Sequence, residues 1–147
     1  MKVGFTGTQS GMTDAQKQVL EEYLEYLLKD NFLEFHHGDC VGADAEAHKI
    51  FLGKVSIVIH PPIDTKKRVF CGGDSAGNGV TILKAKDYLD RNHDIVDATD
   101  FLIATPDGYK EKLRSGTWAT IRYAQKQGKI VAVIWPNGIT GTLGKKE

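Results

Sequence analysis

Small and polar side chains gather in three short segments of this chain, and each segment has the composition of a phosphate-binding turn. The segments are GFTGTQSG at positions 4–11, HHGDCVGAD at positions 36–44 and SGTWATIRYA at positions 115–124. Each lies where an apolar run gives way to a helix-like pattern. Glycine lets a backbone approach a ligand closely, and a helix N-terminus offers unpaired N–H groups and partial positive charge to an anion. We therefore expect a phosphate-bearing, nucleotide-like small molecule.

Two side chains within this set have specific candidate roles. Asp44 could orient a ribose hydroxyl or a ligand amine, because an ionised carboxylate only accepts hydrogen bonds, or it could cap a helix. Arg91 offers a planar fork for bidentate binding of a phosphate or carboxylate, although a solvated helix face would also carry an arginine. The expected ligand-binding residues are Gly7, Thr8, Gln9, Ser10, Gly38, Asp39, Asp44, Arg91, Asn92, Ser115, Gly116 and Thr117.

Other chemistries have less support in the residue pattern. Three histidines and one cysteine fall within positions 36–48, but they match neither CxxC nor HExxH spacing, so we expect no metal site and no cofactor. No pattern typical of a nucleophile surrounds Cys40 or Cys71. The basic run at positions 66–68 could clamp a phosphate or be simply solvated.

Length, charge and composition set broad limits on function. A chain of 147 residues fits one domain with a sizeable core. The 19 Lys and Arg residues balance the 19 Asp and Glu residues, so no overall positive field attracts DNA or RNA, and no nucleic-acid partner is expected. No run approaches the ~20 apolar residues of a membrane span, and the opening MKVGFTG lacks a signal-peptide apolar region. These features predict a cytoplasmic protein with reduced thiols and no membrane partner.

The elements that must position the candidate residues alternate along the chain. Strands are expected at positions 3–6, 32–37, 55–60, 101–105 and 130–135, and helices at about 13–28, 42–52, 86–98 and 116–127. Thr13 with Gln16 predicts a capping box at the first helix, and Gly128 is expected to close the last one. Residues 63–83 lack periodicity and are expected to form a long loop.

Strands separated by helices predict a parallel sheet with helices on both faces. We expect a Rossmann-like, three-layer α/β/α domain at residues 1–136, with a five-stranded parallel sheet in the order 3-2-1-4-5. In that arrangement Gly7, Gly38, Pro106 and Gly116 meet at the carboxyl edge of the sheet, where the ligand would bind. Residues 137–147 are rich in Gly and Lys and are expected to form a loosely held C-terminal tail.

The order of three longer segments resembles the SLOG superfamily, the Rossmann-like group that contains DprA/SMF, LOG and YspA-like proteins. The segments are HHGDCVGAD, LDRNHDIVDATDFLIATP and SGTWATIRYAQKQGK, and the resemblance covers roughly residues 1–136. The matches to the YspA-like branch are His37, Gly38, Gly42, Ala43, Asp44, Arg91, Asn92, Gly116 and Thr117. The resemblance implies a protein that binds nucleotides or nucleotide-derived ligands in the crevice above the sheet. A homo-oligomer is also expected.

Two functions remain open under this resemblance. LOG-type phosphoribohydrolases carry a glutamate three residues after the Gly-Thr pair, where this chain has Thr120, and residues 113–115 replace two glycines that usually precede the pair. A hydroxyl cannot replace a carboxylate at an oxocarbenium-like centre, which favours a sensor or sequestering module for a nucleoside phosphate or ADP-ribose-like molecule. The alternative is an N-glycoside hydrolase or transferase acting on a nucleoside monophosphate, with Asp39, Asp44 or Asp107 supplying the carboxylate. DprA-like binding of single-stranded DNA is disfavoured by the zero net charge. The sequence does not identify any catalytic residue.

Overall fold

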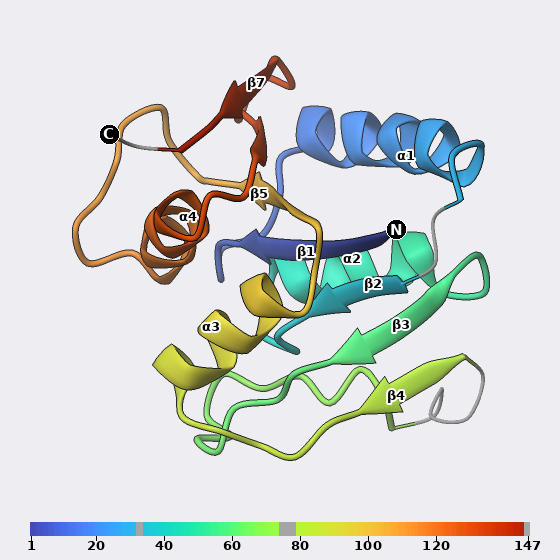
Figure 1. Cartoon of the computed structure of the whole chain (residues 1–147). Coiled ribbons are helices and arrows are strands. Elements are labelled where there is room, and N and C mark those ends of the chain that lie inside the picture. The colour runs from blue at the N-terminus through green and yellow to red at the C-terminus, as the bar shows by residue number, and fades with distance from the viewer. Residues whose placement is uncertain (32–33, 74–78, 146–147) are drawn as a thin grey trace.

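Strands and helices alternate along the chain in the computed structural model, which describes residues 1–31, 34–73 and 79–145 (Figure 1). The strands are β1 (Lys2–Gly7), β2 (Glu34–His37), β3 (Ser56–Ile59), β4 (Val80–Ile82), β5 (Phe101–Thr105), β6 (Val131–Ile134) and β7 (Thr140–Leu143). The helices are α1 (Asp14–Leu28), α2 (Ala43–Phe51), α3 (Tyr88–Asp97) and α4 (Gly116–Lys126). The expected start of the second strand at positions 32–33 lies outside the described residues.

The sheet has the strand order β4-β3-β2-β1-β5-β6-β7. Neighbouring strands are parallel except β6 and β7, which pair in antiparallel fashion. The expected five-stranded, wholly parallel sheet is therefore wrong in strand number and in the order of the complete sheet. The expected strands form its centre as β3-β2-β1-β5-β6, and β4 and β7 extend it at the two edges.

The two additional strands lie in segments that were expected to be irregular. Strand β4 interrupts the expected loop at 63–83, and its three residues are too few to show an alternating pattern. Strand β7 lies in the expected loose tail and pairs with β6 from Val131↔Leu143 to Ile134↔Thr140. Asn137-Gly138 forms the connecting turn, with Gly138 at a φ of 85° and its N–H donating to the Trp135 carbonyl. Asn-Gly between two strands is a strong hairpin signal, and it was missed.

Local sequence explains where the helices begin and end. Helix α1 begins with the expected capping box, in which Thr13 and Gln16 each accept a hydrogen bond from the other residue's backbone N–H. Gly128 follows α4 with a φ of 77°, which agrees with the expected closing glycine. Within the described ranges, no helix is long and apolar enough to cross a membrane.

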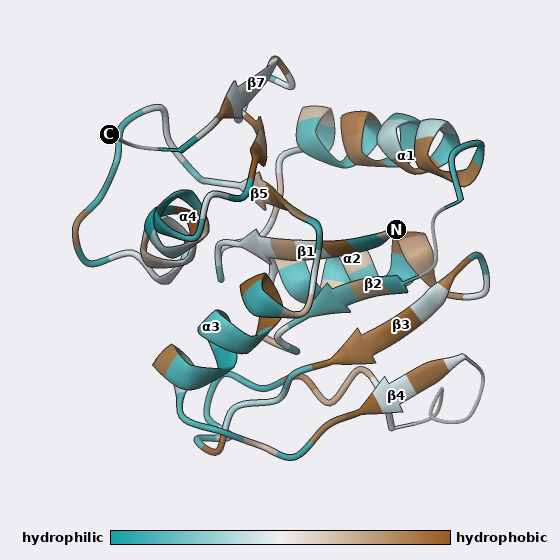
Figure 2. Ribbon diagram, in the orientation of Figure 1, coloured by the Kyte–Doolittle hydropathy of each residue, from teal (hydrophilic) through white to brown (hydrophobic). Residues whose placement is uncertain are grey.

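Apolar side chains form two buried clusters, one on each face of the sheet. Helices α1 and α2 contribute Leu24 and Phe51 to one cluster, and α3 and α4 contribute Ile95 and Ile121 to the other. In Figure 2 strand β3 is brown along most of its length, whereas the helices alternate between brown and teal because only one face of each is buried. Buried Gln16 donates to the carbonyls of Pro106 and Ile134 at 2.8 Å each, and so fixes α1 to the carboxyl ends of β5 and β6.

Candidate functional site

A cavity of about 440 Å³ opens at the carboxyl edge of the sheet. Its size lies within the roughly 300–1,000 Å³ that small-molecule sites occupy. The turns after β1 and β2, one face of α3 and the start of α4 form its walls, and the pairing of Gly7 with Thr105 aligns the ends of β1 and β5. The expected site residues in the lining are Gly7, Thr8, Gln9, Ser10, Gly38, Asp44, Arg91, Asn92, Ser115, Gly116 and Thr117.

Asp39 is the expected site residue that does not line this cavity. It is fully buried, and its carboxylate accepts hydrogen bonds from the Arg68 Nε and the Cys71 backbone N–H, both at 2.8 Å. The basic segment at 66–68 is thereby fixed to the turn after β2, where Cys40 and Arg68 also form an isolated β-bridge. The Asp39 carboxylate therefore connects two segments of the protein instead of facing the cavity.

One face of α3 contributes more to the cavity than the sequence motifs indicated. Tyr88, Arg91, Asn92 and Ile95 all line it, with the i, i+3, i+4, i+7 spacing of a single helical face. The Arg91 guanidinium also lies 5.1 Å from the centre of the Tyr88 ring. Tyr88 and Ile95 were missed, although helical spacing from Arg91 would have found them.

Arg91 places a buried positive charge at the cavity wall, with its side chain only 4% exposed. Its Nη1 donates to the carbonyls of Gly38 and His60, and its Nε donates to the Asn92 Oδ1 at 2.8 Å. Its Nη2 also lies 3.5 Å from the Cys40 sulfur. No carboxylate in the described ranges lies within ion-pair distance of Arg91. Neutral groups thus hold the guanidinium, and its charge has no direct counter-ion among the residues that the structure describes.

Asp44 brings a buried carboxylate to the same cavity. Its Oδ2 accepts the backbone N–H groups of Gly38 at 3.2 Å and Cys40 at 3.1 Å, so it stabilises the turn between β2 and α2. Burial raises the pKa of Asp44 from 3.8 to about 6, although the nearby Arg91 charge and the two amide donors lower it in part. The sequence also allowed Asp44 to cap a helix, but its carboxylate instead stabilises the turn before α2.

The raised pKa of Asp44 gives stability a defined pH dependence. The folded chain binds this proton more tightly than the unfolded chain, so the stabilisation is fully present below about pH 3.8 and is lost as the pH rises to about 6. Such a shift corresponds to roughly 3 kcal/mol. Asp44→Asn keeps an oxygen for both amide donors, so it should be more stable than wild type near pH 8 and lose that advantage near pH 4. Urea unfolding at both pH values measures this, and a pH-independent difference would contradict it.

The N-terminus of α4 presents backbone donors to the cavity. The Ser115 hydroxyl accepts the Trp118 N–H at 3.2 Å, whereas the N–H groups of Gly116 and Thr117 have no acceptor in the described part of the chain. A Cβ added at Gly116 would meet nothing within 4 Å, so open space lies beside these donors. Buried Thr120 also lines the cavity, and its hydroxyl donates to the Gly116 carbonyl at 2.9 Å. Thr120 therefore contributes no acid or base.

The loop before α4 adds charged residues that the motifs did not include. Asp107, Lys112 and Arg114 line the cavity, and Lys112 pairs with Asp107 at 2.8 Å. Arg122 of α4 donates to the carbonyls of Lys112 and Leu113 and so fixes this loop. Arg114 lies immediately before the third motif, and this position is the one sequence signal that indicated its place at the cavity.

Glycines in the motifs were expected to let a ligand approach the backbone, but three of them admit other parts of the protein. A Cβ at Gly38 would lie 2.7 Å from the Arg91 Cζ, and one at Gly42 would lie 2.6 Å from the Thr8 carbonyl oxygen. A Cβ at Gly7 would collide with Ala43 and Thr105. These three glycines shape the cavity through internal packing, whereas Gly116 in the third motif has open space beside it.

Comparison with known proteins identifies the fold. No protein-family model and no curated protein sequence matches the chain. Among four matching solved chains is DNA processing protein A (DprA) from Helicobacter pylori, described by its single-stranded DNA binding mode, with a TM-score of 0.68 and 24% identity. That match covers 90% of this chain, which spans only 64% of the DprA chain. The structural-genomics target TM1055 matches with a TM-score of 0.61 and 17% identity over 87% of this chain and 70% of that one.

These matches support the expected Rossmann-like α/β fold. At such low identity they show the fold alone, and they do not distinguish the YspA-like branch. They also correct one expectation. The exclusion of a nucleic-acid partner rested on zero net charge, and it is contradicted by the similarity to a single-stranded DNA-binding protein. Net charge averages over the whole surface, whereas nucleic acid responds to the local arrangement of cations.

Proposed function

We propose that this protein binds a phosphate-bearing, nucleotide-derived molecule in the cavity at the carboxyl edge of the sheet. The observation that carries the proposal is the buried charge of Arg91, which has no ion-pair partner in the described part of the chain. A buried charge is costly to hold without an opposite charge, and the carbonyls of Gly38 and His60 give Arg91 hydrogen bonds but no negative charge. An anionic ligand would supply that charge.

The groups around Arg91 suit the parts of a nucleotide. The free N–H groups of Gly116 and Thr117 suit phosphate oxygens at the positive end of α4. Asp44 suits a ribose hydroxyl, which can donate to its carboxylate. The match of Arg91 and Asn92 to the YspA-like branch supports the same class of ligand.

A binding module is favoured over an N-glycosidase by the carboxylates available. Asp39 is held by Arg68, Asp107 pairs with Lys112, and Thr120 replaces the glutamate of LOG-type enzymes. Asp44 is the remaining carboxylate of the cavity, and its Oδ2 is already used by two backbone donors. One carboxylate in this position lacks the second acid or base group that glycoside hydrolysis ordinarily requires.

Binding and turnover can be separated in one experiment. The purified protein should raise its melting temperature in the presence of a nucleoside monophosphate or ADP-ribose, because a ligand that binds only the folded state stabilises it by mass action. Chromatography of the same mixtures after hours of incubation should show no free base. Steady base release that Asp44→Asn abolishes would establish the enzyme function instead. The absence of any thermal shift across nucleosides, nucleotides and ADP-ribose would contradict the binding proposal.

Single-stranded DNA is a second candidate ligand, favoured by the DprA match and by cations at the cavity. Lys112 and Arg114 line the cavity, and the basic segment at 66–68 adjoins the turn after β2, where the Val41 N–H donates to the Lys67 carbonyl at 2.8 Å. Fluorescence anisotropy with a labelled oligothymidylate tests this candidate. Binding that weakens with salt and is displaced by a mononucleotide would place DNA in the same cavity.

A further inference from the structure

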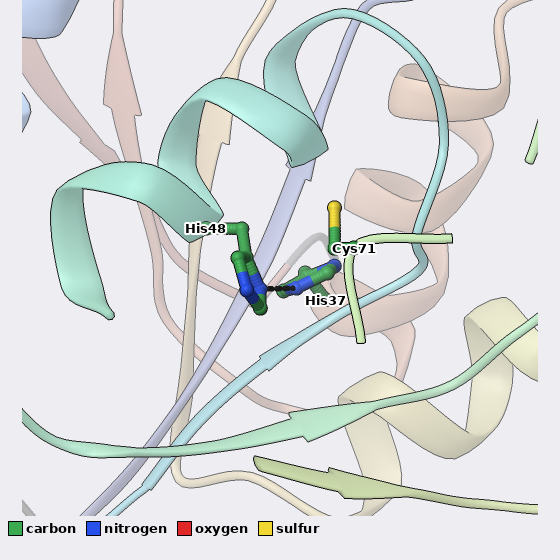
Figure 3. Close-up of side chains that lie close together, drawn as sticks. All are labelled: His37, His48 and Cys71. Atoms are coloured by element: carbon green, nitrogen blue, oxygen red, sulfur yellow. Dashed lines mark hydrogen bonds between the residues drawn. The ribbon is translucent and has the colours of Figure 1, made fainter. Parts of the chain in front are cut away.

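His37, His48 and Cys71, which do not line the cavity, form a cluster on the α2 side of the sheet (Figure 3). They come from three different segments: the end of β2, the middle of α2 and the loop before β4. One ligand atom from each, two ring nitrogens and a sulfur, lie within 4.8 Å of one another. His37 is fully buried and His48 is 4% exposed.

The hydrogen bonds fix how the two imidazoles are protonated. The Asp39 N–H donates to the His37 Nδ1 at 3.0 Å, so the proton of neutral His37 lies on Nε2. That Nε2 lies 2.9 Å from the His48 Nδ1, which therefore accepts. Burial, with the His48 charge next, holds the pKa of His37 well below its usual value, and burial also lowers the pKa of His48. Neutral imidazole is the form in which histidine binds metals.

We propose that His37 Nε2, His48 Nδ1 and Cys71 Sγ bind a divalent transition-metal ion of the Zn²⁺ class, with water as the fourth ligand. Two imidazoles and a thiolate are a donor set typical of zinc and of its spectroscopic substitute Co²⁺. Cys71 is partly exposed, so it is the ligand of the cluster nearest to solvent. This proposal rests on none of the residues that line the nucleotide cavity.

Metal binding at this cluster requires a defined proton movement. The ion takes the position of the shared proton on His37 Nε2, and that proton moves to Nδ1 at the cost of the hydrogen bond from the Asp39 amide. The Cys71 thiol loses its proton to solvent and becomes a thiolate. One proton is therefore released for each ion bound. Because only three protein ligands hold the ion and one hydrogen bond is lost, we expect weaker metal binding than at a closed four-ligand zinc site.

Contacts outside the cluster already hold Cys71 near the histidines. The Asp39 carboxylate accepts the Cys71 N–H at 2.8 Å and pairs with Arg68 at 2.8 Å. Arg68 balances the Asp39 charge, so the two positive charges of the ion face mainly the new thiolate. A bound ion would thus fix the loop at residues 65–71 to β2 and α2.

A cobalt titration tests the proposal on the intact, metal-free protein. One equivalent of Co²⁺ should produce a thiolate charge-transfer absorption and the visible bands of tetrahedral cobalt, and Zn²⁺ should displace both. Cys71→Ser should abolish the charge-transfer band and weaken Co²⁺ binding by more than the ~10–100-fold that outer-sphere partners typically cost. Cys40→Ser is the matched control, because Cys40 is also a partly exposed cysteine but does not belong to the cluster.

Each outcome decides the proposal. A cobalt–thiolate band that is lost in Cys71→Ser and kept in Cys40→Ser supports it, and His48→Gln should then lose the tetrahedral bands. The proposal is overturned if excess Co²⁺ gives no thiolate band with wild-type protein, or if the band depends on Cys40 instead. The wild-type spectrum alone supplies the first of these results, so the test does not depend on the folding of a variant.

Discussion

Replacing Gly42 with alanine should destabilise the fold by roughly 2–6 kcal/mol, as the combined effect of backbone strain and overpacking. Gly42 has a φ of 88° and a ψ of −124°, a conformation that residues with a Cβ rarely adopt. Its Cβ would also lie 2.6 Å from the Thr8 carbonyl oxygen. The Ala43 N–H donates to that same oxygen at 3.0 Å, so the turn after β1 cannot move away without losing a hydrogen bond.

Gly53→Ala is the matched control for this prediction. Gly53 has a φ of 80°, but a Cβ there would meet nothing within 4 Å. It should therefore show only the strain of a positive φ, about 1–2 kcal/mol. Urea unfolding of both variants measures the difference. Equal losses of stability in the two variants would show that the close contact between Gly42 and the turn after β1 does not require a glycine.

Replacing Arg91 with methionine should weaken nucleotide binding by about 1.5–3 kcal/mol, which is roughly 10- to 150-fold in the dissociation constant. The change removes the buried charge that faces the cavity. It also leaves the carbonyls of Gly38 and His60 without this donor, at about 1–3 kcal/mol of stability for each buried group. Calorimetric titration with a nucleoside monophosphate, below the melting temperature of the variant, measures the affinity.

Two further variants separate the effect of charge from that of folding. Arg91→Lys keeps the positive charge but not the planar fork, so it should recover part of the lost affinity. Lys54→Met changes the net charge as Arg91→Met does, but Lys54 precedes β3 at the opposite edge of the sheet, so its affinity should equal that of wild type. An unchanged affinity in folded Arg91→Met would show that the ligand does not use this charge.

The meeting of the three motifs could be predicted from sequence because the carboxyl ends of parallel strands share one edge of a sheet. Once the strands ending at Gly7 and His37 were identified, the cavity position followed. The short strand β4 and the hairpin strand β7 could not be found in this way. Strand β4 depends more on its pairing partner β3 than on its own three residues, which is common for short edge strands, whereas the Asn-Gly turn signal before β7 was missed.

The direction of individual side chains was harder to predict than their position along the chain. Asp39 has a φ of 62° and turns towards Arg68, a contact between residues far apart in sequence. The histidine cluster shows the same limit. The sequence grouped Cys40 with the neighbouring histidines, whereas the fold brings Cys71 to His37 and His48 from a distant loop. No spacing rule within one segment can reveal a contact of this kind.

Nuclear magnetic resonance mapping of a nucleotide titration tests the central claim most directly. On addition of a nucleoside monophosphate, the amide signals of Gly116 and Thr117, with those of Ser10 and Gly38, should shift in a saturable manner. A second hollow of about 530 Å³, lined by Gly128 and other residues, provides an internal control, and its signals should remain unchanged. Shifts confined to that second hollow, or no saturable shift at Gly116 and Thr117, would contradict a nucleotide site at the carboxyl edge of the sheet.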